Sequence, residues 1–374
     1  MTNILIEGPK HMPSFDLTVR DFYQYSTVLP ITIRAKLTKD IKPLDITWCD
    51  VLLSIRGGDP LSEYLVNNVV KIGKKVVLLL DDDLLEYKSE VPSYDKVCRK
   101  SLLNILGKTD CLLTPSRYLG NKYHEQFGIR YSIVDTIIAN NQIKPIEQRD
   151  YDAPVKLLYA AGAKHRPFFE SYIKPILNQL YERYGDKVTL TIVGPNIEVG
   201  MIRMKIEKVG SMPFDKYRQF MNENHFDIGL SPLFDEEFCR SKYFNKYLEY
   251  SVNGICGVYS KVLPYTSVVH DGVNGIFAEN TPESWYSNLC RIIDDSDLRI
   301  DCINNAQQEL TSKFNIEYIA NRVNHDLNDI FTYKANVYQG KICRFMYLRY
   351  WLYRIKRRSQ RLINERMNKL FDSK

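Results

Sequence analysis

Short apolar runs alternate with longer segments of helical period along the first 140 residues. Short apolar runs bounded by turn residues favour buried strands, and apolar positions repeated every three to four residues favour helices. Strands and helices in alternation are typical of an α/β fold with a parallel sheet. The pattern predicts strands at 3–8, 28–34, 50–55, 76–80, 111–114 and 132–138, and helices at 60–72, 94–107 and 116–127.

A polar segment without a hydrophobic period separates this series from a second one. Residues 139–154 include two prolines, and such a segment is typical of an interdomain linker. We therefore expect two domains, residues 1–145 and 146–331, followed by a tail at 332–374. The second series predicts strands at 155–161, 188–193, 202–209 and 226–230, helices at 168–184 and 214–224, and helical segments from 282 to 331.

The stretch from residue 226 to residue 279 has the rhythm of a strand, a helix and a second strand. An apolar run ends at Ser231-Pro232, a helix-length segment closes at Gly254, and another apolar run follows at 255–260. Open parallel sheets bind ligands outside the carboxyl ends of their strands. We therefore expect a ligand site where these strands end.

Three motifs in this stretch resemble the donor-binding half of a known enzyme family. Their order and spacing are similar to those of retaining glycosyltransferases of the two-Rossmann (GT-B) type, in the family 4-like or group 1 branch that includes capsule and exopolysaccharide enzymes. The motifs are Asp227-Ile-Gly-Leu-Ser-Pro-Leu233, Lys246-Tyr-Leu-Glu-Tyr-Ser-Val-Asn-Gly254 and Val268-Val-His-Asp-Gly-Val-Asn-Gly-Ile-Phe-Ala-Glu279.

This resemblance implies two Rossmann-like domains that face each other across a cleft. The second domain would hold a nucleotide-sugar donor, with Glu249 matching the family's glutamate that binds the ribose, and the first would hold a glycan or lipid-linked acceptor. The implied reaction retains anomeric configuration and uses neither a bound metal nor a cofactor beyond the donor substrate. In that family the last helices cross back to the first domain.

Cations and glycines follow the predicted strand ends of the second domain. Negative charge grows on the leaving phosphate as a glycosidic bond to a nucleotide breaks, and fixed cations and backbone N–H groups stabilise it. A glycine lets a phosphate approach the backbone closely. A histidine beside the glycine either donates a hydrogen bond to the phosphate or sugar or has a purely structural role. The predicted donor-binding residues are Gly162, Lys164, His165, Arg166, Gly194, Ser231 and Glu249, and the predicted catalytic residues are Lys242, Lys246 and Glu249.

One position departs from the family pattern. The family often has two glutamates eight positions apart, and the position eight residues before Glu249 is Ser241, although Asp235, Glu236 and Glu237 come shortly before it. This departure keeps open a catalytically silent subunit that binds glycan or a partner enzyme. A nucleotide-sugar epimerase on the same architecture is a further alternative.

Charged residues also follow two predicted strands of the first domain. Arg56-Gly57-Gly58-Asp59-Pro60 comes after the strand at 50–55, and Asp81-Asp82-Asp83 comes after the strand at 76–80. Carboxylates are hard to bury without partners. The three aspartates therefore form either a solvated loop or a cluster that faces the cleft on the acceptor side, and the sequence does not say which of them points inward.

The net charge of +6 is unevenly distributed along the chain. Residues 341–374 contain 11 Lys and Arg against 2 Asp and Glu, and the rest of the chain contains 40 against 43. A basic amphipathic helix with aromatic residues fits an anionic membrane surface, but the same apolar stripe also fits packing on protein. Nucleic acid is the least favoured partner, because the body shows neither a basic patch nor a known motif.

Cysteine, histidine and hydropathy patterns favour an intracellular protein. The eight cysteines are scattered without a C-x-x-C pair, which favours reduced thiols, and the six histidines have no metal-ligand spacing. No signal peptide or membrane-spanning run is evident. We therefore expect a cytoplasmic protein without a metal site, held by its tail on the inner face of the membrane.

Overall fold

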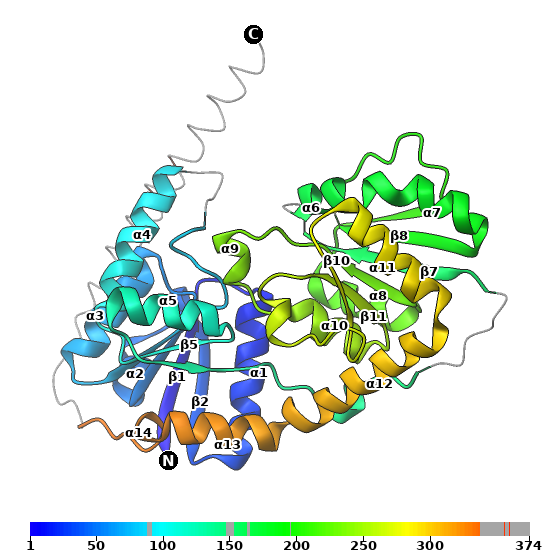
Figure 1. Cartoon of the computed structure of the whole chain (residues 1–374). Helices are drawn as coiled ribbons and strands as arrows, with labels where there is room; N and C mark the ends of the chain where they lie inside the picture. Colours follow the sequence, from blue (N-terminus) through cyan, green and yellow to red (C-terminus); the bar gives the residue numbers. More distant parts are fainter. Residues whose placement is uncertain are drawn as a thin grey trace, which may run out of the picture.

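The described residues of the computed structural model fold into two parallel six-stranded sheets with helices on their faces (Figure 1). The prediction of an α/β fold with two Rossmann-like domains is confirmed. The domain bounds at 145/146 and 331/332 stay predictions. The structure describes residues 1–87, 92–146, 153–162, 165–194 and 196–336, together with Ile355 and Ser359.

The first sheet has the strand order β2-β1-β3-β4-β5-β6. Leu5, Leu52 and Leu78 in its central strands are fully buried, as expected where helices cover both faces of a parallel sheet. Its strands are β1 (Thr2–Gly8), β2 (Ile31–Leu37), β3 (Val51–Ile55), β4 (Lys75–Leu79), β5 (Cys111–Thr114) and β6 (Tyr131–Ile133), and its helices are α1 (Pro13–Val28), α2 (Pro43–Trp48), α3 (Pro60–Lys71), α4 (Pro92–Leu106) and α5 (Arg117–Phe127).

The second sheet has the strand order β12-β11-β10-β7-β8-β9. Its strands are β7 (Val155–Ala160), β8 (Val188–Gly194), β9 (Ile206–Gly210), β10 (Ile228–Ser231), β11 (Cys256–Ser260) and β12 (Ile276–Ala278). The helices of this half are α6 (Arg166–Tyr172), α7 (Leu177–Tyr184), α8 (Phe214–Glu223), α9 (Glu237–Arg240), α10 (Asn245–Val252), α11 (Pro282–Asp294) and α12 (Ser296–Lys313), followed by α13 (Ile316–Asp326) and α14 (Asn328–Phe331).

Each sheet reverses its strand order beside its first strand. In the first sheet β2 and β3 flank β1, and in the second sheet β8 and β10 flank β7. At such a switch point the loops that follow the two central strands diverge, and the crevice between them is where open α/β sheets bind ligands. The crevice of the second sheet therefore lies beyond Ala160 and Ser231, the last residues of β7 and β10.

The last helices return to the first sheet, as the resemblance implies (Figure 1). Helix α13 packs against α1 and β6. The hydroxyl of Thr2 donates to the carbonyl oxygen of Phe331 at 2.6 Å. Asp329 accepts from Arg130 at 2.8 Å and from Lys75 at 3.0 Å. One hydrophobic cluster accordingly runs from the first sheet through α13 into the second half.

Two predicted elements of the second half differ from the prediction by four residues or more, and proline explains one of these differences. The helix predicted at 168–184 is interrupted between Tyr172 and Leu177. Pro175 lies in this gap, and proline has no N–H and collides with the preceding helical turn. The strand predicted at 202–209 begins only at Ile206, where pairing with β8 starts.

The first half also differs from the prediction at α1 and at two strands. The pattern does not predict α1, although Phe15, Phe22 and Tyr25 form its buried face. The strand predicted at 28–34 begins at Ile31, because α1 continues to Val28. The strand predicted at 132–138 ends at Ile133, since its pairing with β5 ends there.

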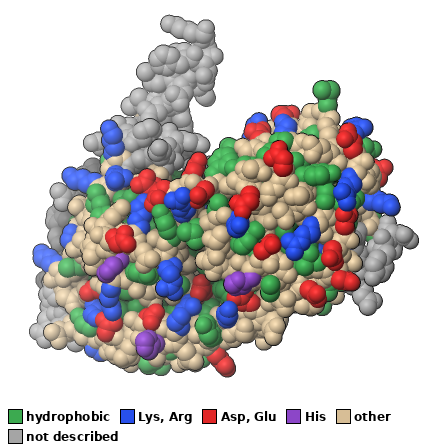
Figure 2. All heavy atoms as spheres, in the orientation of Figure 1, with side chains coloured by type: hydrophobic (Ala, Val, Ile, Leu, Met, Phe, Trp, Pro, Cys, Tyr) green, Lys and Arg blue, Asp and Glu red, His purple; other side chains and the backbone are tan. Residues whose placement is uncertain are grey.

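The predicted basic tail lies almost wholly outside the described residues, so its amphipathic helix stays a prediction. Within the described part of the chain, no helix is long and apolar enough to cross a membrane. Over the described part of the face drawn in Figure 2, basic and acidic side chains are interspersed rather than gathered into one large area of a single sign.

Candidate functional site

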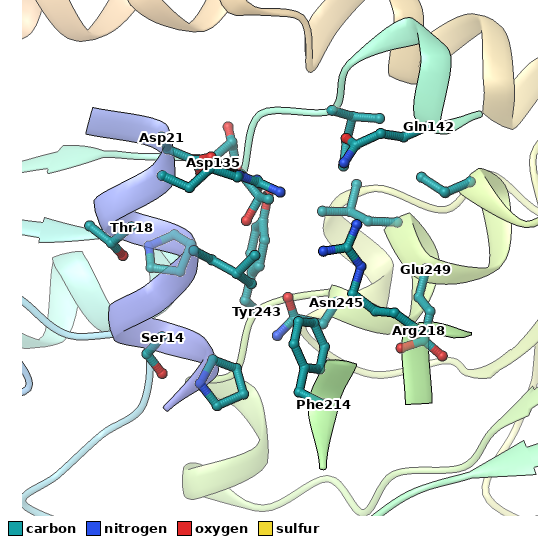
Figure 3. Close-up of a pocket in the computed structure, with 18 of the residues that line it drawn as sticks. Ser14, Thr18, Asp21, Asp135, Gln142, Phe214, Arg218, Tyr243, Asn245 and Glu249 are labelled. Carbon is teal, nitrogen blue, oxygen red and sulfur yellow. Dashed lines mark hydrogen bonds and ion pairs between the residues drawn. The ribbon is translucent and has the colours of Figure 1, made fainter. Parts of the chain in front are cut away.

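Two adjoining cavities lie between the sheets among the described residues. The first measures about 490 Å³ and lies over the carboxyl ends of β7, β8 and β10; we call it the lysine cavity. The second measures about 700 Å³ and lies between α1, residues 134–145, α8 and α10; we call it the linker cavity (Figure 3). Both are lined by Asp81, Phe214, Tyr217, Tyr243, Asn245 and Glu249.

Lys246 and Glu249 lie one turn apart on α10 and line the lysine cavity. The Nζ atom of Lys246 lies 2.7 Å from Oε1 of Glu249, and the same oxygen accepts a hydrogen bond of 2.5 Å from the hydroxyl of Tyr217 on α8. Burial and the neighbouring Glu249 carboxylate raise the pKa of Tyr217, so its hydroxyl stays protonated and donates. Two helices therefore fix the position of this carboxylate.

Lys242 precedes α10 and faces the first sheet across the cavity. Its Nζ atom lies 3.9 Å from Oδ1 of Asp82. Arg56 pairs with Asp82 at 2.9 Å and with Asp81 at 2.6 Å. The φ angle of Arg56 is 51°, a left-handed conformation that is uncommon for a residue other than glycine. The loop after β3 thus places its guanidinium between two carboxylates that line the lysine cavity.

Gly194 and Gly162 bring backbone to the edge of the lysine cavity. Gly194 has a φ of 102°, and a Cβ atom there would lie 2.1 Å from the carbonyl oxygen of Ala161. The β7 and β8 loops therefore touch at a point where only glycine fits. At Gly162 an added Cβ would meet no atom of the described residues within 4 Å, so a ligand has room to approach this backbone.

His165 and Ser231 also line the lysine cavity. Burial, and then the positive charges of Lys242 and Lys246, lower the pKa of His165 to about 4, so its imidazole is neutral at pH 7. The hydroxyl of Ser231 lies 2.5 Å from the hydroxyl of Tyr265. Both side chains can bond to a ligand without adding charge.

The structure brings most of the residues predicted from the sequence to one place. Gly162, His165, Gly194, Ser231, Lys242, Lys246 and Glu249 all line the lysine cavity. Arg166 does not line it; this residue lies on α6, 46% exposed, and pairs with Glu170 at 2.8 Å. Lys164 lies outside the described residues. The chemical roles of all these residues stay predictions.

Ser241, eight residues before Glu249, does not line either cavity. It is fully buried, and its hydroxyl donates to the carbonyl oxygen of Glu237 at 3.1 Å. Glu237 itself reaches the first domain, where Lys122 and Tyr118 bond to its carboxylate at 2.9 and 2.7 Å and lower its pKa. The first residue of α9 therefore links the two halves.

The three consecutive aspartates have separate places. Asp81 and Asp82 line the lysine cavity, whereas Asp83 is fully buried. Asp83 accepts hydrogen bonds from Lys122 at 2.8 Å and from the hydroxyl of Tyr123 at 3.0 Å. The partners that a buried carboxylate needs thus come from α5, and the solvated-loop alternative does not apply to Asp83.

Sequence reasoning missed three residues that shape the site. They are Tyr217, Tyr265 and Arg56, the last of which is the partner of Asp81 and Asp82. A signal for Tyr217 exists in the sequence, because Phe214, Tyr217 and Arg218 follow one face of the predicted helix at 214–224. No such signal identifies Tyr265, which reaches Ser231 from a turn 34 residues later.

This arrangement suits a ligand that carries phosphates beside neighbouring hydroxyls. Ammonium groups make charge-assisted hydrogen bonds to phosphate oxygens, and Lys242 and Lys246 supply them. Within the described residues no partner reaches Oε2 of Glu249, so this oxygen can accept from ligand hydroxyls. No group of three or more His, Cys, Asp or Glu side chains in the described part of the chain is placed to hold a metal ion.

Comparison with known proteins finds similarity in structure only. No family model and no curated protein sequence matches the chain. HepE from Anabaena, solved in complex with UDP-glucose, is 13% identical, and the match covers 88% of this chain and 100% of HepE with a TM-score of 0.60. The lipopolysaccharide outer core galactosyltransferase WaaB is 14% identical, with 88% and 100% of the two chains covered and a TM-score of 0.58.

A third similar structure is a putative UDP-N-acetylglucosamine 2-epimerase from Listeria monocytogenes. It is 10% identical, and the match covers 91% of this chain and 100% of the epimerase with a TM-score of 0.53. Identities of 10 to 14% show a shared fold, which in this chain consists of two parallel sheets with last helices that return to the first sheet. The chain therefore has the GT-B fold of two facing Rossmann-like domains.

Proposed function

We propose that this protein is a glycosyltransferase that moves a sugar from a nucleotide-sugar donor to a glycan or lipid-linked acceptor. The observation that carries the proposal is the convergence of Lys242, Lys246 and Glu249 on the switch-point crevice of the second sheet, beside Gly162 and Gly194. The cavity of about 490 Å³ lies within the usual size range of small-ligand sites. HepE, solved with UDP-glucose, shares the fold and supports this proposal.

In the proposed reaction an acceptor hydroxyl oxygen bonds to the anomeric carbon of the donor sugar. The bond from that carbon to the phosphate oxygen breaks, and its electron pair stays on the phosphate. Lys242 and Lys246 stabilise the growing charge, while Glu249 accepts from the ribose hydroxyls. The acceptor proton passes to the leaving phosphate on the same face of the sugar, so configuration is retained and no bound metal takes part.

The place of the protein in cell-surface polysaccharide or glycoconjugate synthesis is part of the same proposal. It is supported by the resemblance of residues 227–279 to polysaccharide-branch enzymes and by the shared fold of WaaB. We further propose that residues 341–374 bind an anionic membrane surface. Co-sedimentation with phosphatidylglycerol liposomes tests this, and a full chain that stays in the supernatant like a chain cut after residue 340 contradicts it.

Calorimetric titration tests the proposed donor site. UDP, GDP, dTDP and their glucose conjugates are titrated into the wild-type chain, into Glu249→Ala and into Glu182→Ala. We expect one nucleotide to bind the wild type and to lose about tenfold or more in affinity with Glu249→Ala, because hydrogen bonds to a charged group contribute about 1.5–3 kcal/mol. Glu182 lies on α7 outside both cavities and pairs with Arg203, so its variant is the matched control.

The remaining outcomes separate the alternatives. If a well-folded wild type binds none of these nucleotides, the transferase proposal fails and the silent subunit is favoured. If the bound nucleotide sugar isomerises in an NMR tube that contains no acceptor, the protein is an epimerase. The fold shared with the Listeria protein is the reason to run this second measurement.

A further inference from the structure

The linker cavity opens beside the lysine cavity and takes its walls from both domains. From the first domain come α1 and the residues after β6, and from the second come α8 and α10 (Figure 3). Its volume of about 700 Å³ accommodates a ligand the size of a small oligosaccharide or larger. Both cavities are lined by Asp81, Asn245 and Glu249, which form a shared wall between them. Ligands in the two cavities therefore meet at this wall.

Every carboxylate in the lining of the linker cavity has a cationic partner. Asp21 pairs with Arg20 at 2.7 Å, and Asp81 pairs with Arg56 at 2.6 Å. Asp135 pairs with Arg322 at 2.6 Å and also accepts from the hydroxyl of Tyr243 at 2.9 Å. Glu249 pairs with Lys246, as described above. The negative charge of this wall is therefore already compensated.

Arg218 is different from the other cations of the lining. Lys144 donates to the carbonyl oxygen of Met221 at 2.5 Å and Arg20 is paired, but no hydrogen bond or ion pair reaches the guanidinium of Arg218 from the described residues. Figure 3 shows its side chain extending from α8 into the cavity. The lining thus carries one uncompensated positive charge, which favours an anionic ligand.

The other groups around Arg218 suit a carbohydrate. Asn222 and Asn245 line the cavity, and among the described residues neither amide has a side-chain hydrogen bond. An amide offers both a donor and an acceptor, as paired sugar hydroxyls require.

The same lining also has apolar surface. Phe214 and Tyr217 add aromatic faces that can pack against the C–H groups of a sugar. Leu248 and Val252 complete an apolar wall on α10.

We propose that the linker cavity is the acceptor site and that the acceptor is a glycan carrying an anionic group, which pairs with Arg218. This rests on the proposed function, because the reacting hydroxyl must reach a sugar held in the lysine cavity across the wall formed by Asp81 and Asn245. The anionic group is a phosphate or a carboxylate. A phosphate would join the glycan to a lipid carrier, and a carboxylate would belong to an acidic sugar.

Three probes without a nucleotide distinguish these sources. They are N-acetylglucosamine joined through a diphosphate to a ten-carbon chain, methyl β-D-glucuronide, and neutral methyl β-D-glucoside as the reference. Each is titrated by saturation-transfer NMR into the wild type, Arg218→Gln, Lys246→Gln and Lys216→Gln, with and without saturating UDP. Lys216 lies two residues away on α8, outside both cavities, and serves as the matched control.

We expect one charged probe to bind the wild type more tightly than the neutral probe and to lose about tenfold in affinity with Arg218→Gln but not with Lys216→Gln. Whichever charged probe shows this loss identifies the source of the anion. The proposal is overturned if neither charged probe binds the wild type, if Arg218→Gln has no effect, or if binding is lost in Lys246→Gln while Arg218→Gln retains it.

The last of these outcomes would mean that the diphosphate occupies the lysine cavity instead. The result without UDP reports on Arg218 even if the chain binds no nucleotide. Failure of the proposed donor site and failure of the acceptor site therefore give different patterns, since the first is measured by nucleotide titration and the second by the Arg218 comparison.

Discussion

Both sheets reverse their strand order beside their first strand, but their carboxyl ends carry opposite chemistry. Beyond β3 and β4 of the first sheet, Arg56 holds the carboxylates of Asp81 and Asp82. Beyond β7, β8 and β10 of the second sheet lie two glycines and, shortly after, Lys242 and Lys246. Topology thus determines where a ligand can bind, and the residues of the connecting loops determine its charge.

The largest effect is expected where backbone from two loops of the second sheet meets. Gly194→Ala would place a Cβ atom 2.1 Å from the carbonyl oxygen of Ala161 at a φ of 102°. We expect a loss of about 3 kcal/mol or more in the free energy of unfolding, from backbone strain and overpacking together. Urea denaturation measures it.

Gly162→Ala is the matched control for this substitution, because an added Cβ meets nothing within 4 Å in the part of the chain that the structure describes. It should leave the free energy of unfolding within about 0.5 kcal/mol of the wild type. A selective loss of nucleotide affinity in this variant would mean that a phosphate approaches the backbone there. Equal destabilisation by both substitutions would contradict the close contact at Gly194.

The first sheet offers the next test through Glu7, a fully buried carboxyl at the end of β1 that accepts hydrogen bonds from Thr38 and Ser54. Burial raises the pKa of Glu7 to about 7. The folded protein therefore holds the proton of Glu7 more tightly than the unfolded chain does. This proton contributes to the free energy of unfolding at low pH, and the contribution is lost as pH rises from about 4.5 to about 7.

Glu7→Gln removes this titration. We expect the variant to be more stable than the wild type by roughly 3 kcal/mol at pH 8, with little difference near pH 4.5. Denaturation midpoints measured between pH 4.5 and pH 8 check the slope, with exposed Glu125→Gln as the control. A pH dependence like that of the wild type in Glu7→Gln would show that this carboxyl is ionised in the folded protein.

The smallest expected effect tests the difference in charge between the carboxyl ends of the two sheets. Lys246→Gln should weaken nucleotide binding about tenfold, because a charge-assisted hydrogen bond to a phosphate is lost. Asp81→Asn, on the opposite side of the lysine cavity, should change it by less than about threefold, since Arg56 already compensates that carboxylate. Equal losses in the two variants, measured by calorimetry, would mean that both sheets hold the nucleotide.

The sequence identifies the second sheet and its cavity well, for a physical reason. Apolar strands such as Ile228–Ser231 end at turn residues, and parallel strands bring those ends to one edge of the sheet. Lys246 and Glu249 are three positions apart on one helix, so local spacing alone predicts that they are neighbours. No long-range information is needed for these features.

Such reasoning predicts neither the linker cavity nor the burial of Asp83. The walls of the cavity combine Asp21, Asp135 and Asn245, which are unremarkable polar residues more than a hundred positions apart. The burial of Asp83 depends on Lys122 and Tyr123 of α5, whose approach to the loop is set by tertiary packing. Single-sequence periodicity carries no information about these contacts.

Because α13 and α14 pack on the first sheet, that sheet cannot bury the surface beneath them until residues 316–331, which are synthesised after both sheets, have left the ribosome. Ile319 and Val323 of α13 belong to the same hydrophobic cluster as Tyr25 and Val134. At typical elongation rates, roughly 10 to 40 seconds pass between these segments. A nascent chain that stops after α12 therefore keeps this apolar surface exposed, as a binding site for chaperones and a starting point for aggregation.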